Sequence, residues 1–344
     1  MAYIIGEIGQ NHNGSVDIAK LLIEVVSRPI HDKLFGKELK VMDAVKLTKR
    51  DLSQELSASQ MNRIYDTKHS FGKTYGEHRA FLELSDEEHH EVYQYAKSKG
   101  LDFVETLCAV GCLSMLKLFT PDKLKVASRD LTNLPLLAAL AETKIPIILS
   151  TGMGGREELD NALDEITRYH SDVSILHCVS EYPTRHENVN LRTITYLQKN
   201  YPHFKIGYSD HTIGIATPIA AVAMGAKIIE KHITLDRQMK GTDQQGSLAI
   251  DGIYRMVRDL RNLELALGKE KMVIEESVKV AREKLERSIA SNKNLKAGKV
   301  ITVEDLHMLS PGDGFKWADK NLVIGKKLTK DIPKDEIIYK EHFI

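Results

Sequence analysis

The strongest constraint on this chain is an alternation, repeated eight times between Tyr3 and about Gly268, of a short β-rich apolar run with a segment of helical periodicity. The runs are mostly apolar throughout, which is typical of strands buried on both faces of a parallel sheet. A strand that is followed each time by a helix predicts βα units. We expect strands at residues 3–9, 43–47, 101–107, 124–127, 146–150, 173–178, 205–209 and 227–233.

Helix signals fall between these runs. Ser85 and Glu88 have the spacing of a capping box, and they precede a predicted helix that ends near Gly100. Apolar residues between positions 159 and 166 recur at helical spacing. Eight strands and about as many helices within residues 1–268 predict a (β/α)8 TIM barrel of the α/β class. An open, doubly wound sheet is the alternative.

The composition changes after the predicted barrel. Residues 269–286 are highly charged and helix-prone, and we interpret them as a linker. Residues 287–344 are rich in Lys, Gly, Pro and β-branched residues, and KNLKAGKVITVEDL from Lys293 aligns without gaps to KDIPKDEIIYKEHF from Lys330. This repeat predicts a small, symmetric, β-rich domain. A domain of that size is only marginally stable alone, so we expect it to pack on another surface.

Composition and charge exclude several classes of protein. Lys plus Arg and Asp plus Glu number 48 each, so no net field favours nucleic acid or an anionic membrane. Three cysteines are too few for a disulfide framework and do not form a convincing zinc pattern. No run approaches the ~18 apolar residues that span a bilayer, and the first residues do not resemble a signal peptide. We expect a cytoplasmic protein.

Two histidines end consecutive predicted strands, His211 in the motif SDHT and His232 in the motif EKH. Catalytic groups of a (β/α)8 barrel come from the carboxyl ends of its strands. Neighbouring strands are close enough for two imidazoles to share a divalent ion, which would leave other positions open for substrate. The alternative for each histidine is a hydrogen bond that caps its strand. Asp243, in the following loop, would complete the site or act as a base.

Two lysines, Lys46 and Lys125, lie within buried predicted strands. A buried ammonium group needs an anionic partner, supplied by a phosphate or carboxylate of a ligand or by the protein's own Glu7 or Asp130. Serines that end neighbouring strands offer hydroxyl groups of the kind that bind phosphate oxygens. The sequence contains neither a Walker loop nor a dinucleotide glycine fingerprint, so the usual motifs for nucleotides are absent.

At this point the motifs identify a family. GEIGQNHNG, DAVKL, KTYGEHRAFLELS, KVASRDLTNLPLL, ILSTGM, LHCVSEYPT, GYSDHT and GAKIIEKHITLD follow one another along the chain, and the C-terminal repeat completes the set. This order resembles the sialic acid synthases (N-acetylneuraminate synthases), which join phosphoenolpyruvate to an amino-hexose. The resemblance implies a TIM barrel, a C-terminal antifreeze-like (SAF) domain, and a homodimer in which that domain is swapped onto the partner's active site.

The resemblance also implies roles for individual residues. His211 and His232 match the family's ligands for a divalent metal, Mn²⁺ or Mg²⁺. Glu7 and Asp243 match acidic residues at the reacting centre, and Tyr182 matches a tyrosine near the sugar. The positions that hold phosphoenolpyruvate are matched by Lys46, Thr106, Lys125, Ser128, Ser150 and Ser209.

The sugar-facing positions depart from the family's pattern. Ser310 stands where the family has an arginine that contacts the acyl-amino group of the sugar, and the usual SGE is Ser128-Arg129-Asp130. We therefore expect a metal-dependent condensation of phosphoenolpyruvate with an unphosphorylated N-acetylmannosamine-like or deoxy-hexose acceptor. One alternative is a synthase for a phosphorylated sugar, for which Arg129 and Arg185 are the obvious cations. The other is a non-catalytic sugar-binding relative.

Overall fold

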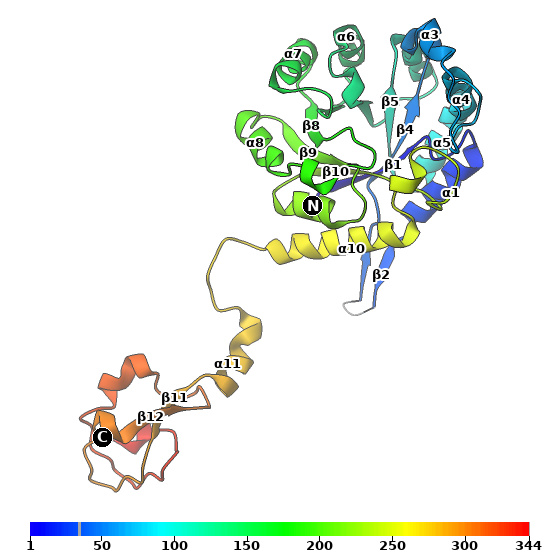
Figure 1. Cartoon of the computed structure of the whole chain (residues 1–344). Coiled ribbons are helices and arrows are strands. Elements are labelled where there is room, and N and C mark those ends of the chain that lie inside the picture. The colour runs from blue at the N-terminus through cyan, green and yellow to red at the C-terminus, as the bar shows by residue number, and fades with distance from the viewer. Residues whose placement is uncertain (34–35, 344) are drawn as a thin grey trace. The chain divides into compact units, whose positions relative to one another are not determined.

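The computed structural model describes residues 1–33 and 36–343, and it divides into two compact units, Met1–Gly268 and Lys269–Ile344. The first unit is a closed barrel of parallel strands surrounded by helices, which Figure 1 shows with its strands in the centre. The strand order around the barrel is β1-β10-β9-β8-β7-β6-β5-β4. This closed sheet confirms the predicted TIM barrel and excludes the open doubly wound sheet. The barrel strands are β1 (Tyr3–Gly9), β4 (Ala44–Lys49), β5 (Asp102–Leu107), β6 (Lys123–Val126), β7 (Ile147–Ser150), β8 (Val173–Cys178), β9 (Lys205–Asp210) and β10 (Ile228–His232).

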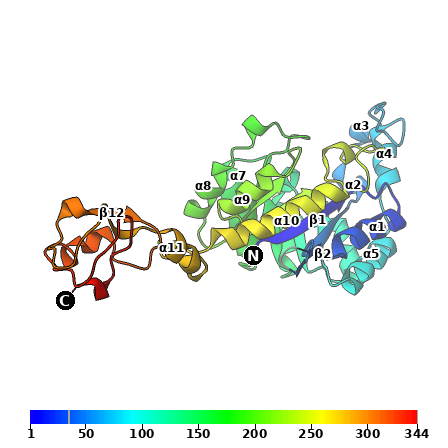
Figure 2. The ribbon, with the colours of Figure 1, turned by 90° about the horizontal axis from the view of Figure 1, so that it is seen from below.

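Along the chain, the helices of the first unit alternate with these strands. The last of them, α10, packs against α9, as seen in Figure 2. The capping box of Ser85 and Glu88 is formed at the start of α5, as predicted. The α-helices are α1 (Val16–Ser27), α2 (Leu52–Glu55), α3 (Ala58–Met61), α4 (Tyr75–Leu82), α5 (Asp86–Ser98), α6 (Leu134–Glu142), α7 (Arg156–Thr167), α8 (Arg192–Asn200), α9 (Ala216–Ala223) and α10 (Ile250–Leu267). The 3-10 helices are η1 (Val110–Lys117), η2 (Ser128–Asp130), η3 (His186–Asn188) and η4 (Gln244–Gly246).

The apolar side chains of the barrel form two clusters. One cluster fills the interior of the barrel and includes Ile5, Val104 and Leu176, each at most 1% exposed. The larger cluster lies between the strands and the helices, where the buried residues of α7 are those of the predicted stripe. The interior is therefore filled by side chains, and polar groups are left for the carboxyl ends of the strands.

Two insertions in the barrel differ from the predicted βα alternation. A two-stranded antiparallel sheet, β2 (Ile30–Asp32) with β3 (Lys37–Leu39), stands between α1 and β4. Its strands have three residues each, too short for a periodicity signal. The helices α2, α3 and α4 occupy the segment between β4 and α5, and this segment later contributes to the candidate site.

The second unit contains the antiparallel pair β11 (Ser288–Ser291) and β12 (Leu306–Leu309), with 3-10 helices η5 (Glu276–Val278), η6 (Val303–Asp305), η7 (Trp317–Leu322) and η8 (Lys340–His342). The predicted repeat is visible in the backbone. Leu295 pairs with its equivalent Ile332, and the equivalent residues Thr302 and Tyr339 precede η6 and η8, where each donates its backbone N–H to the side chain three residues later. The predicted symmetry of this unit is thus present in its strand pairing and turns.

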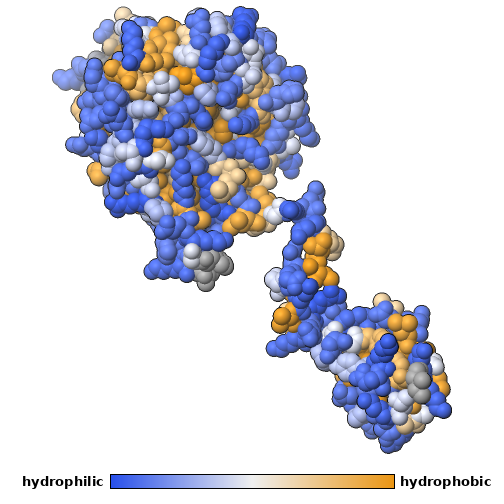
Figure 3. Space-filling view, turned by 180° about the vertical axis from the view of Figure 1, so that it is seen from behind, coloured by the Kyte–Doolittle hydropathy of each residue, from blue (hydrophilic) through white to orange (hydrophobic). Residues whose placement is uncertain are grey.

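Residues 269–286, which we predicted to be a linker, contain η5 and the helix α11 (Lys279–Leu285). The end of this segment is hydrogen-bonded to the rest of the second unit, since Gly312 N donates to Glu283 O at 2.6 Å and Ser310 Oγ donates to Leu285 O at 2.9 Å. Several apolar side chains of this segment are exposed, and orange atoms are visible along it in the space-filling view of Figure 3. Within the described part of the chain, no helix is long and apolar enough to cross a membrane.

Candidate active site

A cavity of about 520 Å³ opens at the carboxyl ends of the barrel strands. The closed barrel brings together residues that lie up to 236 positions apart in the sequence, from Glu7 to Asp243. The cavity is lined by every residue that the sequence assigned to the site, namely Glu7, Lys46, Thr106, Lys125, Ser128, Ser150, Tyr182, Ser209, His211, His232 and Asp243.

Four charged side chains form the floor of this cavity. Lys46 is paired with Glu7 and lies 3.9 Å from Glu230. Lys125 lies 3.9 Å from Glu230, on its other oxygen. All four residues are at most 5% exposed. The floor is thus a buried, alternating group of two ammonium groups and two carboxylates, to which a ligand anion would add a further negative charge.

The electrostatics of the floor separate the two carboxylates. Burial raises the pKa of Glu7, Lys46 opposes this shift and the negative charge of Glu230 adds to it, so that the pKa is about 7. Burial acts in the same direction on Glu230, but Lys125 and Lys46 outweigh it and lower the pKa of that carboxyl. Burial also lowers the pKa of Lys125. Glu230 is therefore the permanent counter-charge, whereas Glu7 exchanges a proton near neutral pH.

Hydroxyl groups surround the same floor. Lys46 Nζ donates to Thr106 Oγ1 at 3.1 Å, and Ser209 Oγ donates to Glu230 Oε1 at 2.8 Å. Ser128 Oγ accepts from Gly152 N at 3.0 Å. Ser150 Oγ is buried and has no hydrogen-bond partner among the described residues. A buried hydroxyl without a partner is costly, so this group is available to a ligand oxygen.

The two predicted metal ligands converge on one side of the mouth. The ring centroids of His211 and His232 are 5.5 Å apart, and the ring of Tyr182 lies 4.1 Å from that of His211. His211 Nδ1 lies 3.0 Å from Val179 O, so a proton on Nδ1 would be donated to that carbonyl and would leave Nε2 free. Burial lowers the pKa of His232, which keeps that imidazole neutral. Neutral imidazoles with an oriented second nitrogen are the form that binds metal.

The donor set fits an ion with open coordination positions. His232 Nδ1 is buried without a hydrogen-bond partner among the described residues. No group of three or more His, Cys, Asp and Glu side chains in the described ranges is placed to hold an ion. Asp243 therefore lines the cavity but does not complete a three-ligand cluster. An ion at the histidine pair would take its remaining ligands from water and substrate.

A buried ion pair supports the two histidines from behind. Asp210 and Lys231, the residues directly before His211 and His232, are 1% exposed and lie 2.6 Å apart. Lys231 also donates to the carbonyl of Thr212. This pair ties the ends of β9 and β10 to the loop that follows β9. It was missed in the sequence because both residues were read only as parts of the SDHT and EKH motifs.

Three arginines, Arg50, Arg79 and Arg129, also line the cavity, and we call them the arginine wall. Only Arg129 was considered in the sequence. Arg79 belongs to the inserted helix α4 and could not be assigned to the cavity before the fold was known, whereas Arg50 directly follows β4 and the rule for strand ends could have found it. Arg185, the other arginine considered, is paired with Glu181 and is not among the residues that line the cavity.

The alternative pairings of the buried lysines are also decided by this geometry. Lys46 pairs with Glu7, as that alternative predicted. Lys125 does not pair with Asp130 but lies beside Glu230, and Asp130 is paired with Arg129 instead. Glu230 was the residue missing from the prediction, although its place two residues before His232 on a strand directs both side chains to the same face.

Comparisons with known proteins agree with this architecture. The NeuB family model matches residues 37–272, and the SAF domain model matches residues 286–344. The chain is 34% identical over 340 residues to the N-acetylneuraminate-9-phosphate synthase of Homo sapiens, which covers 98% of this chain and 92% of that protein. It is 31% identical over 346 residues to the N,N'-diacetyllegionaminic acid synthase of Legionella pneumophila, and this alignment covers 99% of this chain and 94% of that protein.

A solved structure shows the same fold. The crystal structure of N-acetylneuraminic acid (sialic acid) synthetase from Leptospira borgpetersenii in complex with citrate superposes with a TM-score of 0.67 at 29% identity, over 81% of this chain and 90% of that chain. The predictions of a SAF domain and of an enzyme of the sialic acid synthase family are confirmed. The chain belongs to the NeuB family.

Proposed function

We propose that this protein condenses phosphoenolpyruvate with the open-chain aldehyde of an amino-hexose and forms a nonulosonic acid of the sialic acid type and inorganic phosphate. The observation that carries the proposal is the buried floor of Glu7, Lys46, Lys125 and Glu230 beside two converging imidazoles. Its two ammonium groups and the free hydroxyl of Ser150 suit a small, highly charged anion. The relatives named above are synthases of such acids.

The balance of the reaction assigns work to individual side chains. C3 of phosphoenolpyruvate forms a bond to the aldehyde carbon, a water oxygen adds at C2, and the C–O bond to phosphate breaks. Lys46 and Lys125 would hold the phosphate and carboxylate of phosphoenolpyruvate, which places C3 for attack. Glu7, with a pKa raised to about 7, would take the proton from the attacking water.

We further propose a divalent cation, Mn²⁺ or Mg²⁺, at His211 and His232. A bound cation would polarise the aldehyde oxygen as a Lewis acid. Titration of the metal-free protein with Mn²⁺ by calorimetry should show one site that is lost in His232→Ala and kept in His203→Ala, a histidine outside the cavity lining. An unchanged dissociation constant in His232→Ala would refute this site.

The catalytic proposal is tested by phosphate release. Purified protein with phosphoenolpyruvate and Mn²⁺ is incubated with a panel of 2-acetamido and deoxy-hexoses, each free and phosphorylated. We expect phosphate release that depends on both the sugar and the metal, and its loss in Lys46→Met, assayed below the melting temperature of that variant. Binding of the sugars without any turnover would favour a non-catalytic sugar-binding protein.

We also propose a cytoplasmic homodimer in which the C-terminal unit of one copy covers the cavity of the other. The three cysteines are free and buried, as expected in a reducing compartment. Residues 272–285 expose several apolar side chains, which a second copy would cover. Analytical ultracentrifugation of the full chain should give twice the monomer mass at micromolar concentration, and a monomer at that concentration would overturn the proposal.

A further inference from the structure

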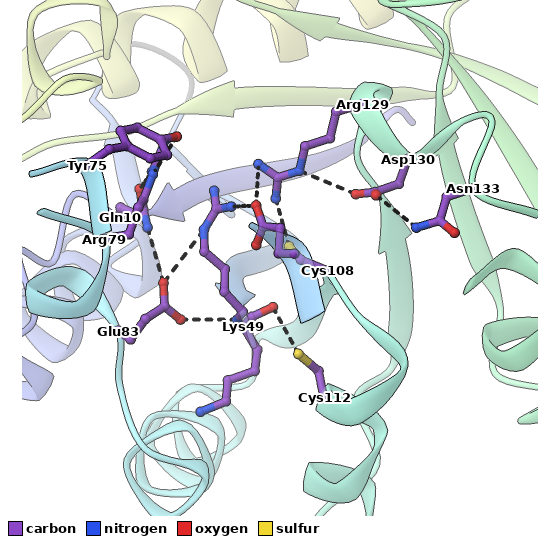
Figure 4. A network of polar contacts seen from close by, with 12 residues as sticks. Gln10, Lys49, Tyr75, Arg79, Glu83, Cys108, Cys112, Arg129, Asp130 and Asn133 are labelled. Atoms are coloured by element: carbon purple, nitrogen blue, oxygen red, sulfur yellow. Dashed lines mark hydrogen bonds and ion pairs between the residues drawn. The ribbon is translucent and has the colours of Figure 1, made fainter. Parts of the chain in front are cut away.

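The arginine wall of the cavity is joined into one network of polar contacts (Figure 4). Arg50 donates to Glu55 Oε1, and Arg129 Nη1 lies 3.5 Å from the same oxygen. Arg50 Nε also lies 3.6 Å from Glu83. One carboxylate oxygen thus holds two guanidinium groups next to each other.

The third arginine is connected through an amide. Gln10 Nε2 donates to Glu83 at 3.4 Å, and Gln10 Oε1 accepts from Arg79. Arg79 also donates from Nε to Tyr75 Oη at 2.9 Å, with its guanidinium 4.9 Å from the tyrosine ring. Each arginine is therefore fixed in place before any ligand binds, which lowers the entropic cost of binding.

The positive charges face the cavity while their partners lie behind them. Arg50, Arg79 and Arg129 line the cavity, whereas Glu55 and Glu83 are not among its lining residues. Arg50 is paired with both carboxylates and Arg129 with Glu55 and with Asp130 at 3.4 Å, whereas Arg79 is bonded to the neutral Gln10 and Tyr75. The side chain of Arg50 is 7% exposed, and its Nε has no hydrogen-bond partner within the described ranges. The carboxylate of Glu83 lies 3.6 Å from this Nε, so the guanidinium group keeps its charged partner behind the wall.

The topology places one end of this wall across the mouth from His232, whereas Arg50 follows β4, two steps from β10 around the barrel. Arg129 follows β6 and His232 ends β10, and four steps around the closed barrel of eight strands separate these two strands. A sugar whose aldehyde lies at the histidines can therefore extend its remote end across the mouth towards Arg129. The rings of Tyr65 and Tyr75 line the same side of the cavity and offer surfaces for the sugar chain.

We propose that Arg50, Arg79 and Arg129 form a subsite for a phosphoryl group at the end of the acceptor sugar remote from its aldehyde. The inference rests on the proposed condensation and names its acceptor class, a phosphorylated amino-hexose. A phosphoryl dianion carries three terminal oxygens, which suits three guanidinium groups better than a neutral hydroxymethyl group does. This acceptor is the alternative to the unphosphorylated sugar that the sequence favoured.

The test compares N-acetylmannosamine with its 6-phosphate, each with phosphoenolpyruvate and Mn²⁺. For the wild type we expect kcat/KM at least tenfold higher for the 6-phosphate. Arg129→Met and Arg79→Met should each lower that value by about 10- to 100-fold, through KM, and should lower the value for the free sugar by a much smaller factor. Arg185→Met is the matched control, because Arg185 lies outside the cavity lining, and it should change neither value.

Several outcomes would overturn the subsite. One is a wild-type kcat/KM for the free sugar that equals or exceeds the value for the 6-phosphate. Another is an equal decrease of kcat/KM for both sugars in the arginine variants. A raised KM for phosphoenolpyruvate alone in Arg129→Met would assign that arginine to the other substrate. If neither sugar turns over, the proposed function fails, and calorimetry still tests the subsite. Tighter binding of the 6-phosphate that is lost in Arg129→Met would support it, and equal binding of both sugars would refute it.

Discussion

Removing the ammonium group of Lys231 tests whether the buried pair behind the histidines holds the end of the barrel together. In Lys231→Met the stem of the side chain is kept, but Asp210 loses its charged partner at 2.6 Å and the carbonyl of Thr212 loses a donor. Breaking a fully buried ion pair costs about 3–5 kcal/mol. Asp210 keeps donors from Tyr208 Oη at 2.8 Å, from Thr212 N at 2.9 Å and from Thr217 Oγ1 at 3.2 Å, so the lower end, about 3 kcal/mol, is expected.

Differential scanning calorimetry measures this cost. At roughly 2–4 °C per kcal/mol for a domain of this size, Lys231→Met should melt about 6–12 °C below the wild type. The double variant Asp210→Asn with Lys231→Met removes both charges, and it should recover at least half of the loss because no unpaired charge stays buried. If the single variant melts within about 2 °C of the wild type, or if the double variant is no better than the single one, the reasoning is refuted.

A second ion pair provides the control. Arg261 Nη2 lies 3.2 Å from Asp43, which precedes β4 at the amino ends of the strands, away from the cavity. Arg261→Met should also lower the melting temperature, but it should leave the affinity for Mn²⁺ unchanged. Lys231→Met should weaken that affinity as well, because the ends of β9 and β10 carry the two imidazoles. Equal effects of both variants on Mn²⁺ affinity would show that the pair has no special part in placing the histidines.

Three further predictions concern charge, capping and space. The pKa of Glu7 is about 7 in the folded chain and near its ordinary value in the unfolded one, so the stability that it contributes below pH 4.5 is lost as pH rises through 7. Between pH 5 and 7, the free energy of unfolding of metal-free Glu7→Gln, measured in urea, should therefore rise relative to that of the wild type by on the order of 1 kcal/mol per pH unit. Free energies of unfolding that change with pH in parallel for both proteins would contradict this. Ser85→Ala removes the cap of α5 and should lower the free energy of unfolding by about 1 kcal/mol in the same assay. An unchanged free energy would show that other contacts hold the first turn of this helix. A Cβ at Gly152 would lie 2.8 Å from Ser128 Oγ, so Gly152→Ala should raise KM for phosphoenolpyruvate, and an unchanged KM would exclude Ser128 from that subsite.

The sequence predicted the barrel because uniform apolar strands and capped amphipathic helices are local signals that tertiary contacts did not override. Strand boundaries shifted by one or two residues, as for the predicted strand 43–47, which the structure extends to Lys49. The hairpin of β2 and β3 was missed because its strands are too short to show a period.

For the site, the sequence predicted the positions of residues but not which of them pair. Residues that end strands, such as Lys46 and His211, could be placed in the sequence because the fold dictates where a strand end points. Their mutual pairing could not, because the choice between Glu7, Asp130 and Glu230 as partners depends on which strands are neighbours in the closed barrel and how far each side chain reaches.

The arginine wall explains why the sequence could predict the class of reaction without predicting the identity of the acceptor sugar. The floor is built by side chains at strand ends, where the closed barrel leaves little freedom for position or orientation. Arg79 instead comes from the inserted helix α4, and its place in the cavity depends on Gln10 and Tyr75, which no periodicity connects to it. The residues that perform the reaction therefore lie at strand ends, where the fold predicts their positions. The arginine wall is built partly from an insertion, and on our proposal it selects the acceptor, so it can change without disturbing the floor.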